Sequence, residues 1–190
     1  PAQVIQTMPA AIATMLDPSD CGPAFLGLPQ DVQGWTYDYP EKFFDKKVHR
    51  IRRQSPDADE INDAIALLKT AKRPMIIAGG GVQYSRAVDE LTSFAIGVTG
   101  SDSANIIAER ADVIVAVGTR LQDFTTGSWT AFAMDAKFIS INAARHDAGK
   151  HMSLPVVGDA KVSLAALASA ATGYKAPSDW TSFARDERKK

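Results

Sequence analysis

The pattern of apolar and polar residues predicts that helices and buried strands alternate along most of the chain. From Ile61 to Leu68 apolar side chains recur at helical spacing, after a helix start signal at residues 55–57. An unbroken apolar run at 74–78 follows, as in a strand that is covered on both faces of a parallel sheet. The same order then repeats, with a helix at 104–110, strands at 112–117, 137–141 and 154–157, and a final helix at 160–171. The sequence therefore predicts an α/β fold, an open Rossmann-like parallel sheet with helices on both faces.

The first 34 residues show a different pattern. Apolar residues recur at helical spacing from Val4 to Leu16, and the run at 23–29 predicts a short strand. One helix and one strand cannot form a domain, so we expect residues 1–34 to be the closing piece of a preceding domain. The remaining predicted parts are a linker at 35–55, the α/β domain at 56–173 and the start of a second linker at 174–190.

A strand of the alternating pattern is missing in the middle of the α/β domain. The helix that ends near Phe94 runs into a glycine-containing stretch and then into the next predicted helix, with no apolar strand between them. We therefore predict that a segment is absent at the join of residues 95 and 96. The chain also opens at Pro1 with no initiator methionine, so we expect it to start inside a longer polypeptide.

Three consecutive glycines follow the first strand of the predicted α/β domain. Gly79, Gly80 and Gly81 let the backbone turn sharply and approach a ligand, and the next helix directs its first amides toward any phosphate. The alternative is that these glycines serve only a tight turn between strand and helix. The triplet does not have the G-x-G-x-x-G spacing of a dinucleotide fingerprint, so it does not decide between the two.

Three further candidate residues follow the next two predicted strands. Gly118 stands at the carboxyl end of the second strand, where open α/β sheets bind ligands, and Arg120 is suited either to a phosphate or carboxylate or to a structural salt bridge. Asn142 follows the third strand, at a position suited to hydrogen bonding a ribose or adenine, or to a plain turn. Together with the glycine triplet, these residues predict a nucleotide site.

Composition narrows the classes of partner. Twenty-one basic and 22 acidic residues give a net charge of −1, which offers no electrostatic footprint for nucleic acid or an anionic membrane, so we expect a small-molecule substrate. The basic stretch at 46–53 is interpreted as a solvated linker. A single cysteine, Cys21, fits a reducing cytoplasm, and neither a zinc-ligand spacing nor a catalytic grouping of Ser, His and Asp is present in the sequence.

Several blocks of sequence together resemble the thiamine-diphosphate-dependent enzymes related to acetolactate synthase. Residues 22–33 resemble the end of their pyrimidine-binding domain, and 71–82, 111–120 and 154–160 resemble parts of their central domain. Within the family, the blocks 37–40, 97–101 and 121–129 look most like the members that hydrolyse trihydroxycyclohexane-1,2-dione in myo-inositol catabolism. The resemblance implies hydrolysis of a ring carbon–carbon bond to give 5-deoxyglucuronate, with thiamine diphosphate held through Mg²⁺ in a homodimer or homotetramer.

The resemblance also implies what this chain lacks. The family's cofactor-activating glutamate would lie before residue 1 and its Mg²⁺–diphosphate motif after residue 190, so we expect no catalytic or metal-binding residue here and an inactive isolated chain. Some relatives bind FAD or ADP on the central domain; Asn142 stands where the flavin-binding ones carry aspartate. Two alternatives stay open: an acetolactate-synthase-like carboligase fragment, and a free-standing nucleotide- or flavin-binding module.

Overall fold

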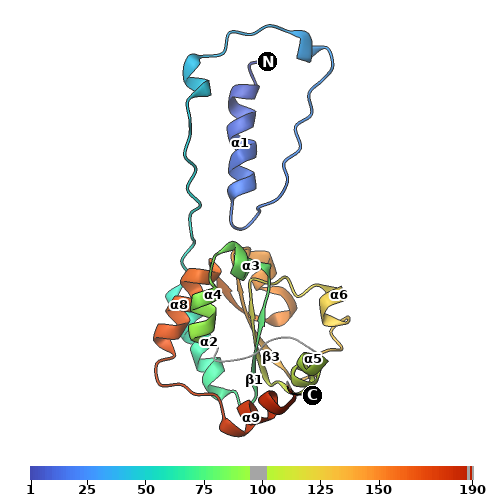
Figure 1. The fold of residues 1–190 in the computed structure, drawn as a ribbon, viewed down its shortest axis with the longest axis vertical. Helices are drawn as coiled ribbons and strands as arrows, with labels where there is room; N and C mark the ends of the chain where they lie inside the picture. The colour runs from blue at the N-terminus through green and yellow to red at the C-terminus, as the bar shows by residue number, and fades with distance from the viewer. Residues whose placement is uncertain (95–101, 188, 190) are drawn as a thin grey trace. The chain divides into compact units, whose positions relative to one another are not determined.

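The computed structural model describes residues 1–94, 102–187 and 189, and these residues form two compact units. The first unit is Pro1–Arg52 and the second is Arg53–Lys190. Figure 1 labels most of the α-helices and the strands β1 and β3. No helix among the described residues is long and apolar enough to cross a membrane.

The first unit contains one α-helix and two short 3-10 helices. The α-helix α1 spans Val4–Leu16, and the 3-10 helices η1 and η2 span Val32–Gly34 and Glu41–Phe44. The strand predicted at 23–29 does not form, so that prediction was wrong. A strand requires a neighbouring strand for its hydrogen bonds, and the described residues of this unit contain no other strand.

The second unit is built on a four-stranded parallel sheet in the order β1-β2-β3-β4. Residues Pro74, Val113 and Lys137 lie side by side at the start of the first three strands, and Ile139 pairs with Leu154. All five residues of β2 are buried, because strands flank it on both sides and helices cover both faces. The strands are β1 (Pro74–Ala78), β2 (Val113–Val117), β3 (Lys137–Asn142) and β4 (Leu154–Val157).

Alternate residues of the strands carry two hydrophobic clusters, one on each face of the sheet. Val113, Val115 and Val117 pack against α2 (Ala58–Thr70), α4 (Val88–Phe94) and α8 (Ala160–Ala170). Ile114 and Ala116 point the other way and pack against α5 (Asp102–Arg110) and α9 (Ser178–Glu187). The predicted fold, an α/β parallel sheet with helices on both faces, is confirmed.

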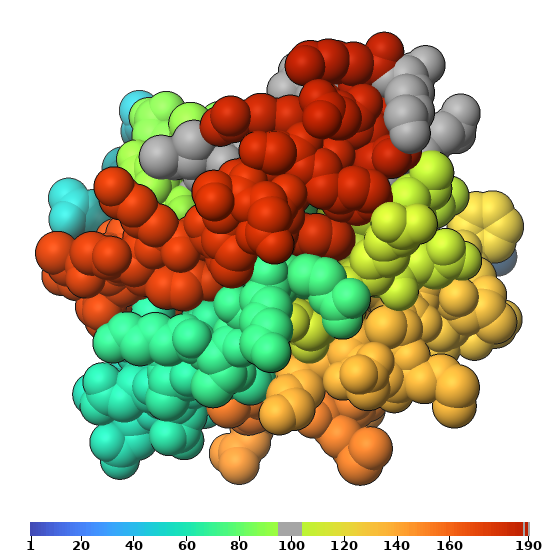
Figure 2. Space-filling model, turned by 90° about the horizontal axis from the view of Figure 1, so that it is seen from below, coloured from blue at the N-terminus to red at the C-terminus, as the bar shows by residue number. Residues whose placement is uncertain are grey.

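Helix α9 lies within residues 174–190, for which the sequence predicts only the start of a linker. Trp180 is 7% exposed, and its indole N–H donates to the carbonyl oxygen of Pro74 at 2.8 Å. The guanidinium of Arg110 on α5 lies 4.9 Å from the centre of the Phe183 ring. Figure 2 shows α9, in red, beside α5, in yellow-green. Helix α9 is therefore packed onto the sheet at the start of β1.

The short helices follow the carboxyl ends of the strands. Helix α3 (Gly80–Tyr84) comes after β1, α6 (Asp123–Thr126) after β2, and α7 (Arg145–Ala148) with η3 (Lys150–Met152) after β3. In a parallel sheet these carboxyl ends meet at one edge. That edge carries all six of the candidate residues predicted from the sequence.

Candidate functional site

The glycine turn after β1 packs directly against the turn after β2. The amide of Gly79 donates to the carbonyl of Val117 at 2.8 Å, and the amide of Gly81 donates to the carbonyl of Gly118 at 2.9 Å. A Cβ on Gly79 would lie 2.5 Å from the Gly118 carbonyl oxygen, and one on Gly81 would lie 2.6 Å from the Gly118 Cα. These distances leave no room for any side chain, so the contact between the two loops requires glycine at both positions.

Gly118 and Gly80 differ sharply in what surrounds them. Gly118 has a φ of +58°, and a Cβ there would lie 2.6 Å from the Cα of Gly81. Both the backbone conformation and the close approach therefore require glycine. At Gly80, by contrast, no described heavy atom lies within 4 Å of where a Cβ would be. Gly80 faces open space at the start of α3.

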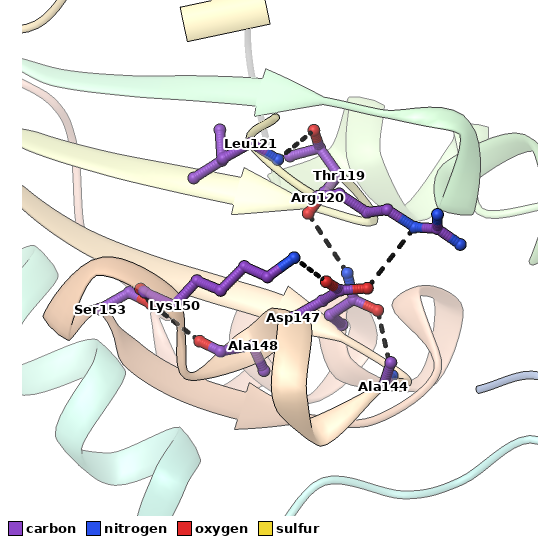
Figure 3. Close-up of polar contacts among 9 residues, drawn as sticks. Thr119, Arg120, Leu121, Ala144, Asp147, Ala148, Lys150 and Ser153 are labelled. Carbon is purple, nitrogen blue, oxygen red and sulfur yellow. Dashed lines mark hydrogen bonds and ion pairs between the residues drawn. The ribbon is translucent and has the colours of Figure 1, made fainter. Parts of the chain in front are cut away.

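Arg120 takes part in an ion cluster that the chain itself completes (Figure 3). Its Nε lies 3.5 Å from Oδ2 of Asp147, and the ammonium of Lys150 contacts Oδ1 of the same carboxylate. Asp147 is 14% exposed, whereas the Arg120 side chain is 64% exposed. The one carboxylate therefore faces two cations, and the Arg120 pair is the more solvent-screened of the two contacts.

Asn142 uses both ends of its side-chain amide within the chain. Its Nδ2 donates to the carbonyl of Thr119 at 3.2 Å, and its Oδ1 accepts from the amide of Ala144 at 3.0 Å. The side chain thus ties the turn after β2 to the segment that leads into α7. A ligand that hydrogen bonded to Asn142 would compete with these two contacts.

The structure brings the predicted residues to one edge and adds residues that the sequence did not single out. Thr119 links the turns after β2 and β3, while Asp147 and Lys150 form the ion cluster with Arg120. The sequence did hold a signal for the last pair, since an acidic and a basic residue three positions apart can pair on a helical turn. It gave no signal that they would face Arg120.

The loops after β2 and β3 also carry unusual backbone conformations. Ser128 and Trp129 have φ values of +54° and +67°, and His151 and Met152 have values of +57° and +55°. The rings of Trp129 and His151 lie against each other, with centroids 3.7 Å apart. Left-handed conformations at residues other than glycine cost energy and persist where surrounding contacts hold them, so this ring contact joins two strained loops.

The residues described here do not fit the binding of thiamine diphosphate through a metal ion. Among residues 1–94, 102–187 and 189, no group of three or more His, Cys, Asp or Glu side chains could hold a metal ion. The carboxylate that contacts Arg120, that of Asp147, is already paired with two cations. We therefore derive no reaction step from this edge of the sheet.

Comparison with known proteins identifies the family. The family model described as "Thiamine pyrophosphate enzyme, central domain" matches residues 61–96 and 95–167. The chain belongs to this family. Its sheet, with helices on both faces, is thus the central domain of a thiamine pyrophosphate enzyme.

Several curated relatives of this thiamine pyrophosphate enzyme chain share the name 3D-(3,5/4)-trihydroxycyclohexane-1,2-dione hydrolase. The chain is 39% identical to the Geobacillus thermodenitrificans protein over 201 residues, covering 92% of the chain and 31% of that protein. For the Clostridium tetani protein the identity is 41% over 197 residues, which cover 89% of the chain and 31% of that protein. For the Bacillus subtilis protein the identity is 38% over 203 residues, which cover 92% of the chain and 32% of that protein. The chain thus spans about a third of the length of these relatives.

A solved structure supports the fold independently. The X-ray structure of a Mycobacterium smegmatis protein described as a thiamin diphosphate-dependent enzyme superposes with a TM-score of 0.68 at 20% identity. The superposition covers 93% of this chain and 38% of that one. At this identity the likeness speaks for the shared fold alone.

The alignments also bear on the predicted join of residues 95 and 96, which lies outside the described residues. The alignment with the Geobacillus protein extends over 201 positions, more than the 190 residues of this chain, so the relative carries residues without a counterpart here. The family match is in two pieces that meet at residues 95–96. The described helices on either side, α4 and α5, lie on opposite faces of the sheet.

Proposed function

We propose that this chain is the central domain, with flanking pieces, of a thiamine-diphosphate-dependent hydrolase. In this proposal the whole protein cleaves a carbon–carbon bond of 3D-(3,5/4)-trihydroxycyclohexane-1,2-dione and releases 5-deoxyglucuronate in inositol catabolism. The observation that carries it is the shared name of relatives that are 38–41% identical over about nine tenths of the chain. The blocks 37–40, 97–101 and 121–129, which resemble these hydrolases, also favour a hydrolase over an acetolactate-synthase-like carboligase.

In this proposal the described edge of the sheet is architectural. Gly79 and Gly81 let the turn after β1 lie against Gly118, and Asn142 fixes the next turn along the edge. Arg120 has its own carboxylate partner in Asp147. Each contact is made by the chain with itself, which supports a role in holding the fold rather than in binding FAD or ADP.

The cofactor and the assembly belong to the whole protein in this proposal. Thiamine diphosphate would be held through Mg²⁺ by parts of the polypeptide outside this chain. The protein would work as a homodimer or homotetramer in the cytoplasm, and the one free cysteine among the described residues, Cys21, is consistent with a reducing compartment. The isolated chain would then be inactive.

Turnover by the whole protein tests the proposed reaction. The full-length polypeptide that contains this chain is supplied with thiamine diphosphate and Mg²⁺ and offered either the cyclic dione or pyruvate. We expect loss of the dione with formation of 5-deoxyglucuronate, and no acetolactate from pyruvate. Acetolactate formation without dione cleavage would instead identify a carboligase.

A second measurement tests the alternative of a free-standing nucleotide module. Thermal unfolding of the 190-residue chain is followed with FAD, ADP or NAD present at millimolar concentration. We expect no shift in the unfolding temperature, because a ligand stabilises a protein only if it binds the folded state. A shift of several degrees with FAD or ADP would show a nucleotide site and contradict the architectural role.

A further inference from the structure

One buried carboxylate, Asp159, joins three distant segments of the second unit. Its side chain is 2% exposed, and the residue lies two positions after the end of β4. Oδ2 accepts hydrogen bonds from Nη1 of Arg53 and from the hydroxyl of Ser85, both at 2.8 Å. Oδ1 caps the start of α8 by accepting from the amides of Lys161 and Val162 at 3.0 and 3.4 Å. A buried charge with four donors is satisfied only while all of these segments stay in place.

The backbone next to Asp159 also holds the segment that contains Arg53. This segment, residues 46–56, is called the connector below. The amide of Asp159 donates to the carbonyl of Gln54 at 2.8 Å. A Cβ on the preceding residue, Gly158, would lie 2.7 Å from Oγ of Ser163, 3.0 Å from the amide nitrogen of Pro56 and 3.1 Å from the carbonyl of Gln54. The connector therefore lies directly against the backbone between β4 and α8, and glycine at 158 permits this close approach.

The rest of the basic stretch lacks such an anchor. Residues 46–52 are exposed and have no regular secondary structure. Among the ion pairs of the described residues, Arg53 is the one member of the stretch 46–53 that takes part. The anchored part of the connector thus begins at Arg53.

We propose that Asp159 is a clamp that ends the movable part of the connector at Arg52. Residues from Arg53 onward move with the sheet, and the bond between Arg53 and Gln54 is shielded from proteases that cut after arginine. Such a protease draws the arginine side chain into a pocket, so it can cut here only after the guanidinium has left Asp159. The cleavage rate then follows the small fraction of molecules in which the clamp is open.

Limited trypsin digestion of the 190-residue chain tests the clamp. Arg50 and Arg52 are changed to Gln, so that Arg53 is cut as an internal residue, and mass spectrometry follows the products. Cleavage after Lys46 and Lys47 serves as the internal reference, so the quantity measured is the rate of cleavage after Arg53 divided by the rate after these lysines. A peptide of residues 44–58 with the same changes gives the intrinsic value of this ratio. Relative to that peptide, we expect cleavage after Arg53 in the folded chain to be roughly tenfold slower or more.

Variants at the clamp sharpen the test. Asp159→Asn can still cap α8 through its oxygen but offers Arg53 an amide in place of a carboxylate, so cleavage after Arg53 should approach the intrinsic ratio. Lys161→Gln is the matched control, because it removes only the ion pair between Lys161 on α8 and Glu90 on α4 and keeps the backbone amide that Asp159 accepts from, so it should leave the ratio unchanged. If the folded chain with Asp159 intact were cut after Arg53 at the ratio of the peptide, the proposal would be wrong. It would also be wrong if folded Asp159→Asn kept the same ratio as the chain with Asp159 intact. If Asp159→Asn does not fold, the comparison between the peptide and the folded chain that retains Asp159 still decides.

Discussion

Helices α1 and α2 are both 13 residues long, yet they differ in what they bury. None of the 13 described residues of α1 is buried, although the helix is rich in apolar side chains. Helix α2 buries Ile61, Ala64, Ile65 and Leu68 against the sheet. An apolar helix therefore contributes a core only where a complementary surface lies beside it, and the second unit supplies that surface for α2.

The two helices differ at their ends as well. The carboxylate of Asp57 caps α2 by accepting from the amide of Asp59 at 2.8 Å, whereas Gln3 gives α1 no side-chain cap. Helix α1 also contains Pro9, which cannot donate a helical hydrogen bond. We infer that the packing of buried side chains holds the elements of the second unit together, whereas α1 in the first unit gains no buried residue. The predictions below test this contrast by pairing changes in the second unit with matched changes in the first.

The largest effect is expected from Gly118→Ala. Residue 118 has a φ of +58°, and the new methyl group would lie 2.6 Å from the Cα of Gly81. The nearest atoms all belong to the backbone of Gly81 and Val82, so no side-chain movement can relieve the clash. We expect a loss of about 4 kcal/mol in the free energy of unfolding, from the left-handed conformation and the steric clash together. Urea unfolding followed by tryptophan fluorescence measures it.

Gly34→Ala in the first unit is the control for that change. No described heavy atom lies within 4 Å of a Cβ at Gly34, so the free energy of unfolding should change by less than about 1 kcal/mol. Equal effects of the two substitutions would contradict the close packing of the turns after β1 and β2.

Leu164→Ala should have the next largest effect. Leu164 is fully buried on α8, and its removal should leave a cavity against the sheet that costs about 3 kcal/mol. Met15→Ala on α1 removes a side chain that is 41% exposed and should cost less than about 0.5 kcal/mol. Urea midpoints of the two variants give the comparison, and a large loss for Met15→Ala would show that the first unit has a core of its own.

Trp180→Phe tests the contact between α9 and the start of β1. The substitution keeps an aromatic ring but removes the hydrogen bond to the Pro74 carbonyl, so we expect a loss of about 1 kcal/mol. Trp35→Phe, at a side chain that is 62% exposed in the first unit, should leave stability unchanged. Circular dichroism during urea unfolding measures both variants without relying on the altered fluorophore.

Tyr174 gives the smallest expected effect, and that effect depends on pH. Burial, and secondly the negative charge of Asp112, raises the pKa of the Tyr174 phenol above its usual value near 10. Between about pH 10 and that raised pKa, the unfolded chain has lost the proton that the folded chain still holds, so folding becomes less favourable as pH rises. This contribution is fully present below pH 10 and declines above it.

The substitution Tyr174→Phe should remove this pH dependence. Since the hydroxyl is buried without a hydrogen-bond partner among the described residues, the variant should match or exceed the stability of the natural chain near pH 7 by up to about 1 kcal/mol. Its advantage should grow above pH 10. Urea midpoints of the variant and of the natural chain, measured from pH 7 to pH 11, check this growth.

The sheet was predictable from the sequence because its strands are continuous apolar runs. The runs at 74–78 and 154–157 match β1 and β4 in both bounds. The run at 23–29 was not distinguishable from these by composition, and it does not form a strand because the described residues of its unit contain no other strand to pair with. Helix α9 escaped prediction, although Trp180 and Phe183 stand three positions apart on what proved to be its buried side. The boundaries predicted for the family's domains stay predictions.

The candidate site shows where sequence reasoning reaches its limit. The position of the glycines after β1 and β2 follows from the pattern, and their presence at the carboxyl edge of the sheet follows from its topology. The contact that requires them, between Gly81 and Gly118, joins residues 37 positions apart and is visible only in three dimensions. The same holds for Asp147, whose position beside Arg120 depends on the order of β2 and β3 in the sheet.

The two anchors of the flanking segments lie at opposite corners of the sheet. Asp159 follows the carboxyl end of β4, and Trp180 reaches Pro74 at the amino end of β1. Tension applied through these anchors would run diagonally across the sheet and shear its three strand pairings together. The many hydrogen bonds of those ladders would share the load instead of breaking one after another. Arg53 and helix α9 are thereby fixed at corners of the sheet that lie diagonally across from each other, so motion of one relative to the other requires the sheet to deform.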